Sequence, residues 1–124
     1  MSLFKSVSVV SYHVTDWEKA KKFYQETLEW PVNYVSDEAG WIEFGFEDKT
    51  LLAISRWEGP EPIPPRLGGA TAVLDVTDAY KVANELRSRG VKCDDVVEIP
   101  GMVCYGTFYD PEGNCIQFAS DPTK

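Results

Sequence analysis

Val14-Thr15-Asp16 is found a second time in the chain as Val76-Thr77-Asp78, 62 positions later in a sequence of 124 residues. An apolar, strand-like run precedes each copy, and apolar residues at helical spacing follow each copy. A match of three residues alone is common, but a shared context on both sides is not. The repeat therefore predicts two copies of one structural module.

Both modules have the same predicted order of elements, which is strand, helix, strand, strand, strand. Module 1 spans residues 4–57, a connector rich in proline and glycine spans 58–69, and module 2 spans 70–120. The predicted strands cover 7–14, 32–36, 41–46 and 50–57 in the first module and 70–76, 91–99, 103–109 and 114–119 in the second. The chain is thus predicted to be one α+β domain over residues 1–124.

The repeated tripeptide also predicts where each helix begins. Thr15 stands three residues before Glu18, which is the spacing of a capping box, so the first helix is expected to use Thr15 as its N-cap. In the second module either Thr77 or Asp78 is expected to cap the helix.

The net charge of the chain limits its partners. Twelve Lys and Arg stand against 20 Asp and Glu, giving a formal charge of −8, which opposes the binding of polyanions. Nucleic acid and membrane surfaces are therefore not expected partners. No apolar run reaches the roughly 18 residues of a membrane span, and no secretory signal pattern precedes the first strand, so a cytoplasmic location is expected.

Five short motifs occur in a fixed order along the chain. They are Val14-Thr15-Asp16, Phe23-Tyr24, Leu28-Glu29-Trp30, Asp110-Pro111-Glu112-Gly113-Asn114 and Ile116-Gln117-Phe118. With these motifs and its duplicated module, the chain resembles the vicinal oxygen chelate superfamily, which includes glyoxalase I, bleomycin-resistance proteins, fosfomycin-resistance enzymes and extradiol dioxygenases. The resemblance implies two curved mixed sheets around a cup, with helices outside, and a homodimer. It does not imply one activity, because function depends on the site that the fold carries.

Enzymes of that superfamily hold a metal ion with four side chains in the cup. The resemblance places these positions at Val9, Leu52, Thr71 and Gln117. None is a histidine or a carboxylate, and valine and leucine have no donor atom. The metal site is therefore expected to be absent, and no cofactor is predicted. The alternative is a displaced site in a shifted register, formed by His13, Glu43, Asp75 and a further carboxylate.

Eight residues are predicted to bind a ligand, and none is predicted to be catalytic. They are His13, Ser11, Arg56, Trp41, Trp57, Phe108, Gln117 and Cys115. Strand alternation places His13, the only histidine, on the same face as Ser11, and Arg56 on the same face as Leu52. The aromatic residues are expected to line an apolar cleft.

Gln117 offers a neutral amide for hydrogen bonding, and Cys115 shares its strand face. Nothing next to Cys115 in the sequence is able to lower its pKa. Several of the eight predicted residues also have a purely structural interpretation. His13 would then be a polar residue at the end of the sheet, Arg56 would form an ion pair at its rim, and the aromatic residues would pack in the core.

Three functions are considered, and the empty metal positions favour the first. The first is a metal-independent protein, resembling the bleomycin-resistance branch, that binds a small organic molecule of aromatic or cationic character. The second is a metal-dependent lyase or dioxygenase, resembling glyoxalase I, with a displaced or degenerate site. The third is an interaction module whose cup is filled by its own aromatic side chains.

Overall fold

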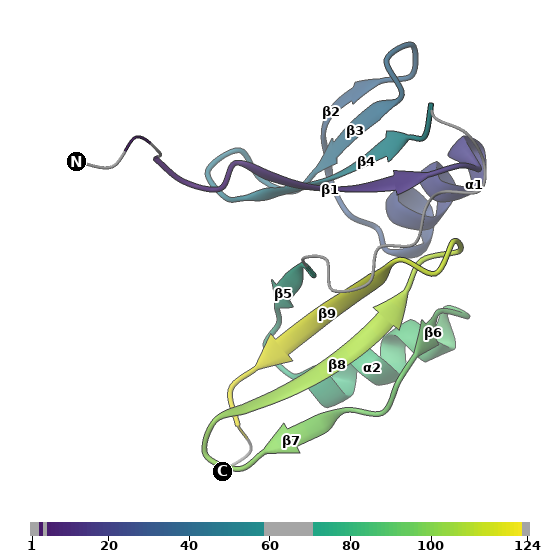
Figure 1. Ribbon diagram of the computed structural model, residues 1–124. Helices are drawn as coiled ribbons and strands as arrows, with labels where there is room; N and C mark the ends of the chain where they lie inside the picture. Colours follow the sequence, from purple (N-terminus) through teal and green to yellow (C-terminus); the bar gives the residue numbers. More distant parts are fainter. Residues whose placement is uncertain (1–2, 4, 59–70, 123–124) are drawn as a thin grey trace. The chain divides into compact units, whose positions relative to one another are not determined.

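The computed structural model (Figure 1) describes residue 3 and residues 5–58 and 71–122. Contacts within the chain divide it into two compact units, Met1–Pro65 and Arg66–Lys124, and each unit is described by itself. The connector predicted at 58–69 lies, apart from Glu58, outside the described residues. In the part of the chain that is described, no helix has the length and apolar character needed to cross a membrane.

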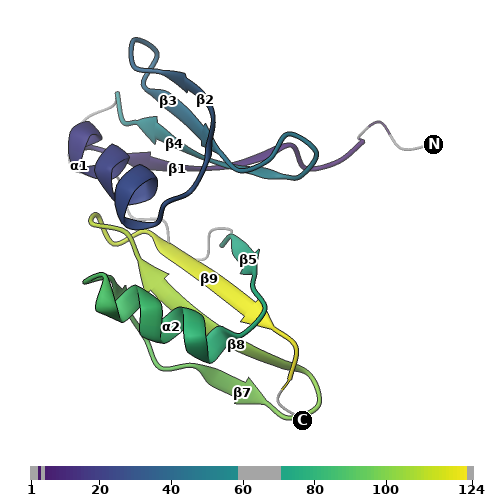
Figure 2. The same ribbon diagram turned by 180° about the vertical axis from the view of Figure 1, so that it is seen from behind.

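Unit 1 is a four-stranded mixed sheet with one helical segment on one side (Figures 1 and 2). Its elements are β1 (Val9–Val14), α1 (Trp17–Lys22), a π-helical turn η1 (Phe23–Thr27), β2 (Val32–Ser36), β3 (Trp41–Phe44) and β4 (Leu51–Arg56). The strand order is β1-β4-β3-β2, in which β1 and β4 are parallel and the other neighbours are antiparallel.

Unit 2 repeats this plan. Its elements are β5 (Val73–Asp75), α2 (Ala79–Ser88), β6 (Lys92–Cys93), β7 (Val97–Ile99), β8 (Val103–Tyr109) and β9 (Cys115–Ser120). The strand order is β5-β9-β8-β6, and β7 also pairs with β8. Again the first and last strands of the unit, β5 and β9, are parallel. In Figure 2, α2 lies in front of β8 and β9. The α+β class is confirmed. Unit 1 has the element order that the repeat predicts, whereas unit 2 has one strand more.

The core of unit 1 lies between the helical segment and one face of its sheet. The buried side chains that point to this face come from β1, β3 and β4 and include Tyr12, Val14, Ile42, Phe44, Leu52 and Ile54. Tyr24 of η1 is fully buried and stacks on Phe44, with 5.5 Å between ring centroids. The opposite face of the sheet is not covered by α1 or η1.

The core of unit 2 is built in the same way. On β8 and β9, buried residues alternate with half-buried ones, and the buried set comprises Cys104, Gly106, Phe108, Ile116 and Phe118. Ala79, Ala83 and Leu86 of α2 are the buried residues of the helix. Such strict alternation is typical of a sheet with one face against a helix and the other face free of it.

Each helix begins at the aspartate of the repeated tripeptide. Asp16 Oδ1 accepts a hydrogen bond from the backbone N–H of Lys19 at 3.1 Å, and Asp78 Oδ1 accepts one from that of Lys81 at 3.2 Å. The prediction that Thr15 caps the first helix is therefore wrong. A carboxylate also stabilises the positively polarised N-terminus of a helix, which a hydroxyl group does less well.

The predicted strand over 91–99 is two short strands, β6 and β7, so this prediction is wrong in its continuity. The residues 94–96 between them are not part of a strand, although the backbone N–H of Asp94 still donates a hydrogen bond to the carbonyl of Thr107 on β8 at 2.8 Å. Asp94 accepts a hydrogen bond from the Tyr109 hydroxyl at 2.7 Å, and Asp95 forms an ion pair with Arg87 at 3.1 Å. Both acidic side chains of the interruption are therefore bound within unit 2.

Candidate functional site

Two rows of side chains cross the sheet of unit 1 on the side opposite α1, which we call the helix-free face of unit 1. Residues paired across neighbouring strands project to the same side of a sheet, so the strand register identifies the members of each row. The rows are His13, Ser55 and Trp41, and next to them Ser11, Ala53 and Glu43. Trp57 follows β4 on the same side and contacts His13 edge to face, with 5.2 Å between ring centroids.

The two tryptophans of this face differ from the other two of the chain. Trp41 and Trp57 are half-buried and project from the helix-free face, whereas Trp17 is buried and Trp30 stacks on Phe44 on the other side of the sheet. Trp41 Nε1 donates a hydrogen bond to Glu43 Oε2 at 3.1 Å. A half-buried indole ring with a fixed orientation is a good surface for an aromatic ligand.

Four of the eight predicted ligand-binding residues share this face: His13, Ser11, Trp41 and Trp57. From the sequence, Glu43 is expected only as part of a displaced metal site. Its alternation with Ile42 and Phe44, which are both fully buried, is the sequence signal that places it beside Trp41 on the other face.

Arg56 lies on the helix-covered face, and its predicted position in the cup is corrected. It pairs with Val14, which is fully buried, and its guanidinium lies 5.7 Å from the centre of the Trp17 ring. The guanidinium also donates to the backbone oxygens of Asp37 and Glu38 at 3.1 and 3.2 Å. Arg56 thus holds the turn between β2 and β3 against α1.

Asp37 connects this turn to α1 through its side chain. Its Oδ1 accepts hydrogen bonds from Lys21 Nζ at 2.7 Å and from Trp17 Nε1 at 3.0 Å. These two donors lower the pKa of the Asp37 carboxyl, and the same contact raises the pKa of Lys21. Through these contacts Trp17 and Arg56 join α1 to the turn between β2 and β3, so both residues stabilise the fold of unit 1.

The half-buried residues of β8 and β9 lie on the side of the sheet opposite α2, which we call the helix-free face of unit 2. Gln117 and Cys115, the next two predicted residues, lie on this face. Gln117 pairs with Thr107, and its Nε2 donates to Thr107 Oγ1 at 3.3 Å. Phe108, by contrast, is buried against α2 and contacts Phe118, with 6.1 Å between ring centroids. Its predicted place in the cup is corrected, because Phe108 belongs to the buried row of β8.

The sequence of this chain and the fold of both units match known proteins. The family model described as "Glyoxalase/Bleomycin resistance protein/Dioxygenase superfamily" matches residues 6–118. The chain belongs to this superfamily. A comparison with curated proteins found no match.

Solved structures of the superfamily share the fold at low sequence identity. TnmS3, an antibiotic binding protein from Streptomyces sp. CB03234, has a TM-score of 0.75 at 24% identity, over 99% of this chain and 100% of that chain. A putative glyoxalase family protein from Bacillus anthracis has a TM-score of 0.77 at 18% identity, over 98% of both chains. A glyoxalase/bleomycin resistance protein from Streptomyces sp. CB03234 has a TM-score of 0.65 at 27% identity, over 91% and 98%.

The strand register corrects one of the four superfamily metal positions. Ser11 pairs with Ala53, and Val73, its equivalent 62 positions later, pairs with Gln117. The residue equivalent to Gln117 is therefore Ala53, and Leu52, the predicted one, lies on the helix-covered face. The corrected set of Val9, Ala53, Thr71 and Gln117 offers one hydroxyl and one amide. This donor set does not fit a divalent transition metal, which needs imidazole, thiolate or carboxylate ligands.

The displaced metal site is not assembled within a unit. His13 and Glu43 lie in different rows of the helix-free face and on strands separated by β4. Among the described residues, no three His, Cys, Asp or Glu side chains come together as a possible metal site.

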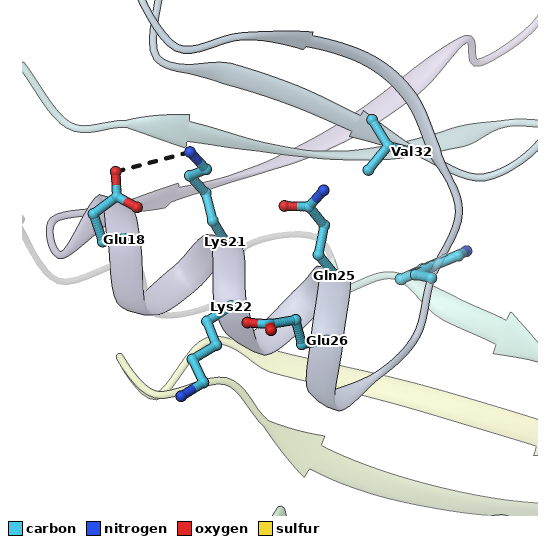
Figure 3. Close-up of a pocket in the computed structure, with 7 residues that line it drawn as sticks. Glu18, Lys21, Lys22, Gln25, Glu26 and Val32 are labelled. Atoms are coloured by element: carbon cyan, nitrogen blue, oxygen red, sulfur yellow. Dashed lines mark ion pairs between the residues drawn. The ribbon is translucent and has the colours of Figure 1, made fainter.

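A polar hollow of about 460 Å³ lies beside α1 and η1, on the opposite side of the sheet from the helix-free face (Figure 3). It is lined by Glu18, Lys21, Lys22, Gln25, Glu26, Trp30 and Val32. In Figure 3, Lys21 points to Glu18, with 3.8 Å between the charged groups. Two cations and two anions balance each other here, and Lys21 is already bound to Asp37. Trp30 is thus a tryptophan of unit 1 that lies away from the helix-free face.

The Cys115 thiol is expected to react slowly. Burial raises the pKa of Cys115, and burial likewise raises the pKa of Cys93. Since the thiolate is the nucleophile, a raised pKa lowers the reactive fraction at neutral pH. At about pH 8, Ellman's reagent is expected to modify Cys115 several-fold more slowly than free glutathione, and the rate should rise steadily to about pH 10.

Replacement Cys115→Ser identifies the contribution of this thiol to the reaction. A thiol at position 115 that reacts faster than glutathione at about pH 8 would show a lowered pKa, contrary to the burial of this group.

Proposed function

We propose that the protein binds a small organic molecule with a planar aromatic part, and that it does so without a metal ion. The observation that carries the proposal is the placement of Trp41 and Trp57 on the helix-free face of unit 1, next to His13. Ligand sites of this kind combine aromatic side chains with a few polar groups that fix orientation.

Two further observations support the proposal. The superfamily metal positions lack suitable donors, which favours binding over metal chemistry. TnmS3, whose fold this chain shares over nearly its whole length, is an antibiotic binding protein. The homodimer expected from the resemblance remains part of the proposal.

A pair of matched tryptophan replacements tests the site. Trp41 and Trp30 are both half-buried residues of unit 1, but they lie on opposite faces of the sheet. Acridone, a neutral planar compound, and 9-aminoacridine, its cationic relative, serve as probes in calorimetric titrations. Removing a stacking aromatic typically costs about 1–3 kcal/mol of binding free energy, so Trp41→Ala is expected to weaken the binding of a probe about fivefold or more. Trp30→Ala should change it less than about twofold.

Circular dichroism of both variants verifies that the fold is retained. If the wild-type protein binds neither probe up to about 1 mM, the proposed function is wrong. A loss of binding in Trp30→Ala, with none in Trp41→Ala, would place the ligand in the polar hollow instead.

Elemental analysis of protein purified without chelators addresses the metal-dependent alternative. The proposal expects no stoichiometric transition metal. One bound equivalent per chain would contradict metal-independent binding and favour the lyase or dioxygenase function.

A further inference from the structure

Glu43 is a half-buried carboxylate within the two rows of the helix-free face of unit 1. It projects from β3 and pairs with Ala53 of β4. Ala53 is fully buried, and its side chain is a single methyl group. Trp41 lies two residues before Glu43 on the same strand face. An anionic group and an aromatic ring are therefore neighbours on this face.

Two hydrogen bonds hold the Glu43 carboxylate in place. Trp41 Nε1 donates to Oε2 at 3.1 Å, and Asn33 Nδ2 donates to Oε1 at 3.4 Å. Asn33 reaches Glu43 because the pairing of β2 with β3 is irregular between Val32 and Tyr34. A carboxylate has about four acceptor positions, so each oxygen retains capacity for a further donor.

Among the described residues of β1, β3 and β4, no Lys or Arg shares this face with Glu43. The other residues that β1, β3 and β4 place on the helix-free face are Val9, Ser11, His13, Trp41, Leu51, Ala53 and Ser55. Glu43 is the only Asp, Glu, Lys or Arg among these described strand residues. Arg56 is the cationic residue of β4, and it lies on the opposite face, paired with Val14.

We propose that Glu43 selects cationic aromatic ligands at this site. The inference rests on the proposed function and adds the chemical class of the ligand. A protonated amine on the ligand donates a charge-assisted hydrogen bond to the oriented carboxylate. The aromatic part of the ligand lies against Trp41, whose indole ring also attracts a cation. The formal charge of −8 attracts the same class of molecule at long range.

The replacement Glu43→Gln tests this selection because it removes the charge and retains the shape of the side chain. The probes are again 9-aminoacridine, which is cationic at neutral pH, and acridone, which is neutral and has the same three-ring skeleton. The wild-type protein is expected to bind 9-aminoacridine at least about tenfold more tightly, since a charge-assisted hydrogen bond is roughly twice as strong as a neutral one. Glu43→Gln should remove this preference and change acridone binding less than about twofold.

Glu47→Gln is the matched control, because Glu47 is exposed in the loop after β3 and carries the same charge. It should leave the preference for the cation intact. If Glu43→Gln keeps the preference, or if Glu47→Gln removes it equally, selection by Glu43 is refuted and only the overall charge acts. Equal wild-type binding of both probes also refutes the inference, yet leaves the proposed function standing. Only the absence of binding to either probe overturns both.

Discussion

Alanine at position 106 is expected to lower the free energy of unfolding by about 2–3 kcal/mol, in the range of other overpacked cores. Gly106 lies on β8 and pairs with Phe118 of β9. A Cβ atom built on Gly106 would lie 2.3 Å from Cζ of the Phe118 ring and 2.7 Å from its Cε2. Phe118 is buried to 99% and packs on Phe108, so the ring has little freedom to move away.

Urea unfolding of the full chain, followed by circular dichroism, measures this effect. A double-mutant cycle with Phe118→Leu verifies the cause, because a smaller side chain makes room for the new methyl group. The double variant should be more stable than the sum of the two single changes predicts. A Gly106→Ala protein within about 0.5 kcal/mol of wild type would show that the sheet adjusts without cost.

Replacement of Asp110 by alanine is expected to cost about 3 kcal/mol, because it removes the acceptor of several buried hydrogen bonds at once. Asp110 is 5% exposed. Its Oδ1 accepts hydrogen bonds from the backbone N–H groups of Glu112 at 2.9 Å and Asn114 at 2.8 Å, and its Oδ2 accepts one from Asn114 Nδ2 at 2.8 Å. These bonds close the turn that joins β8 to β9.

Asp110→Asn is the matched control for this turn. The amide oxygen of asparagine still accepts the two backbone hydrogen bonds, and Asn114 can rotate its own amide to accept the third. We expect a loss of about 1 kcal/mol, clearly smaller than that of alanine. Equal losses for both variants would indicate that charge, and not hydrogen-bond geometry, matters at this position.

The turn around Asp110 shows how far sequence reasoning reaches in this chain. Asp110-Pro111-Glu112-Gly113 is a turn in the structure, with Gly113 at a positive φ of 85° and its N–H donating to the Asp110 carbonyl at 2.9 Å. Proline and glycine at these places predict the turn directly. The role of the Asp110 side chain depends on its burial, which no local pattern reveals.

The largest difference between prediction and structure concerns which face of the sheet each residue of β4 occupies. Leu51, Leu52, Ala53 and Ile54 are all apolar, and the last three are buried although Ala53 points to the other side of the sheet. An apolar run without alternation does not indicate which face a residue takes. The prediction that Leu52 and Arg56 face the cup is therefore wrong for both residues.

Strand β1 gave a clear prediction for the opposite reason. Ser11 is exposed and alternates with the buried residues Tyr12 and Val14. This pattern places His13 with Ser11 on the helix-free face, as predicted. The sequence alone does not indicate the place of Glu43 in the candidate site, because this depends on the pairing of β3 with β4 and on the hydrogen bond from Trp41.

The parallel pairing of first and last strands has a consequence for how the chain folds. Val9 pairs with Leu51, 42 positions further along, and Val73 pairs with Gln117, 44 positions further along. Contacts so distant in sequence carry a loop-closure entropy that must be overcome before they form, which slows folding. Neither sheet can be completed until its final strand has been synthesised. During translation, β4 therefore becomes available to complete the first sheet before any strand of the second exists.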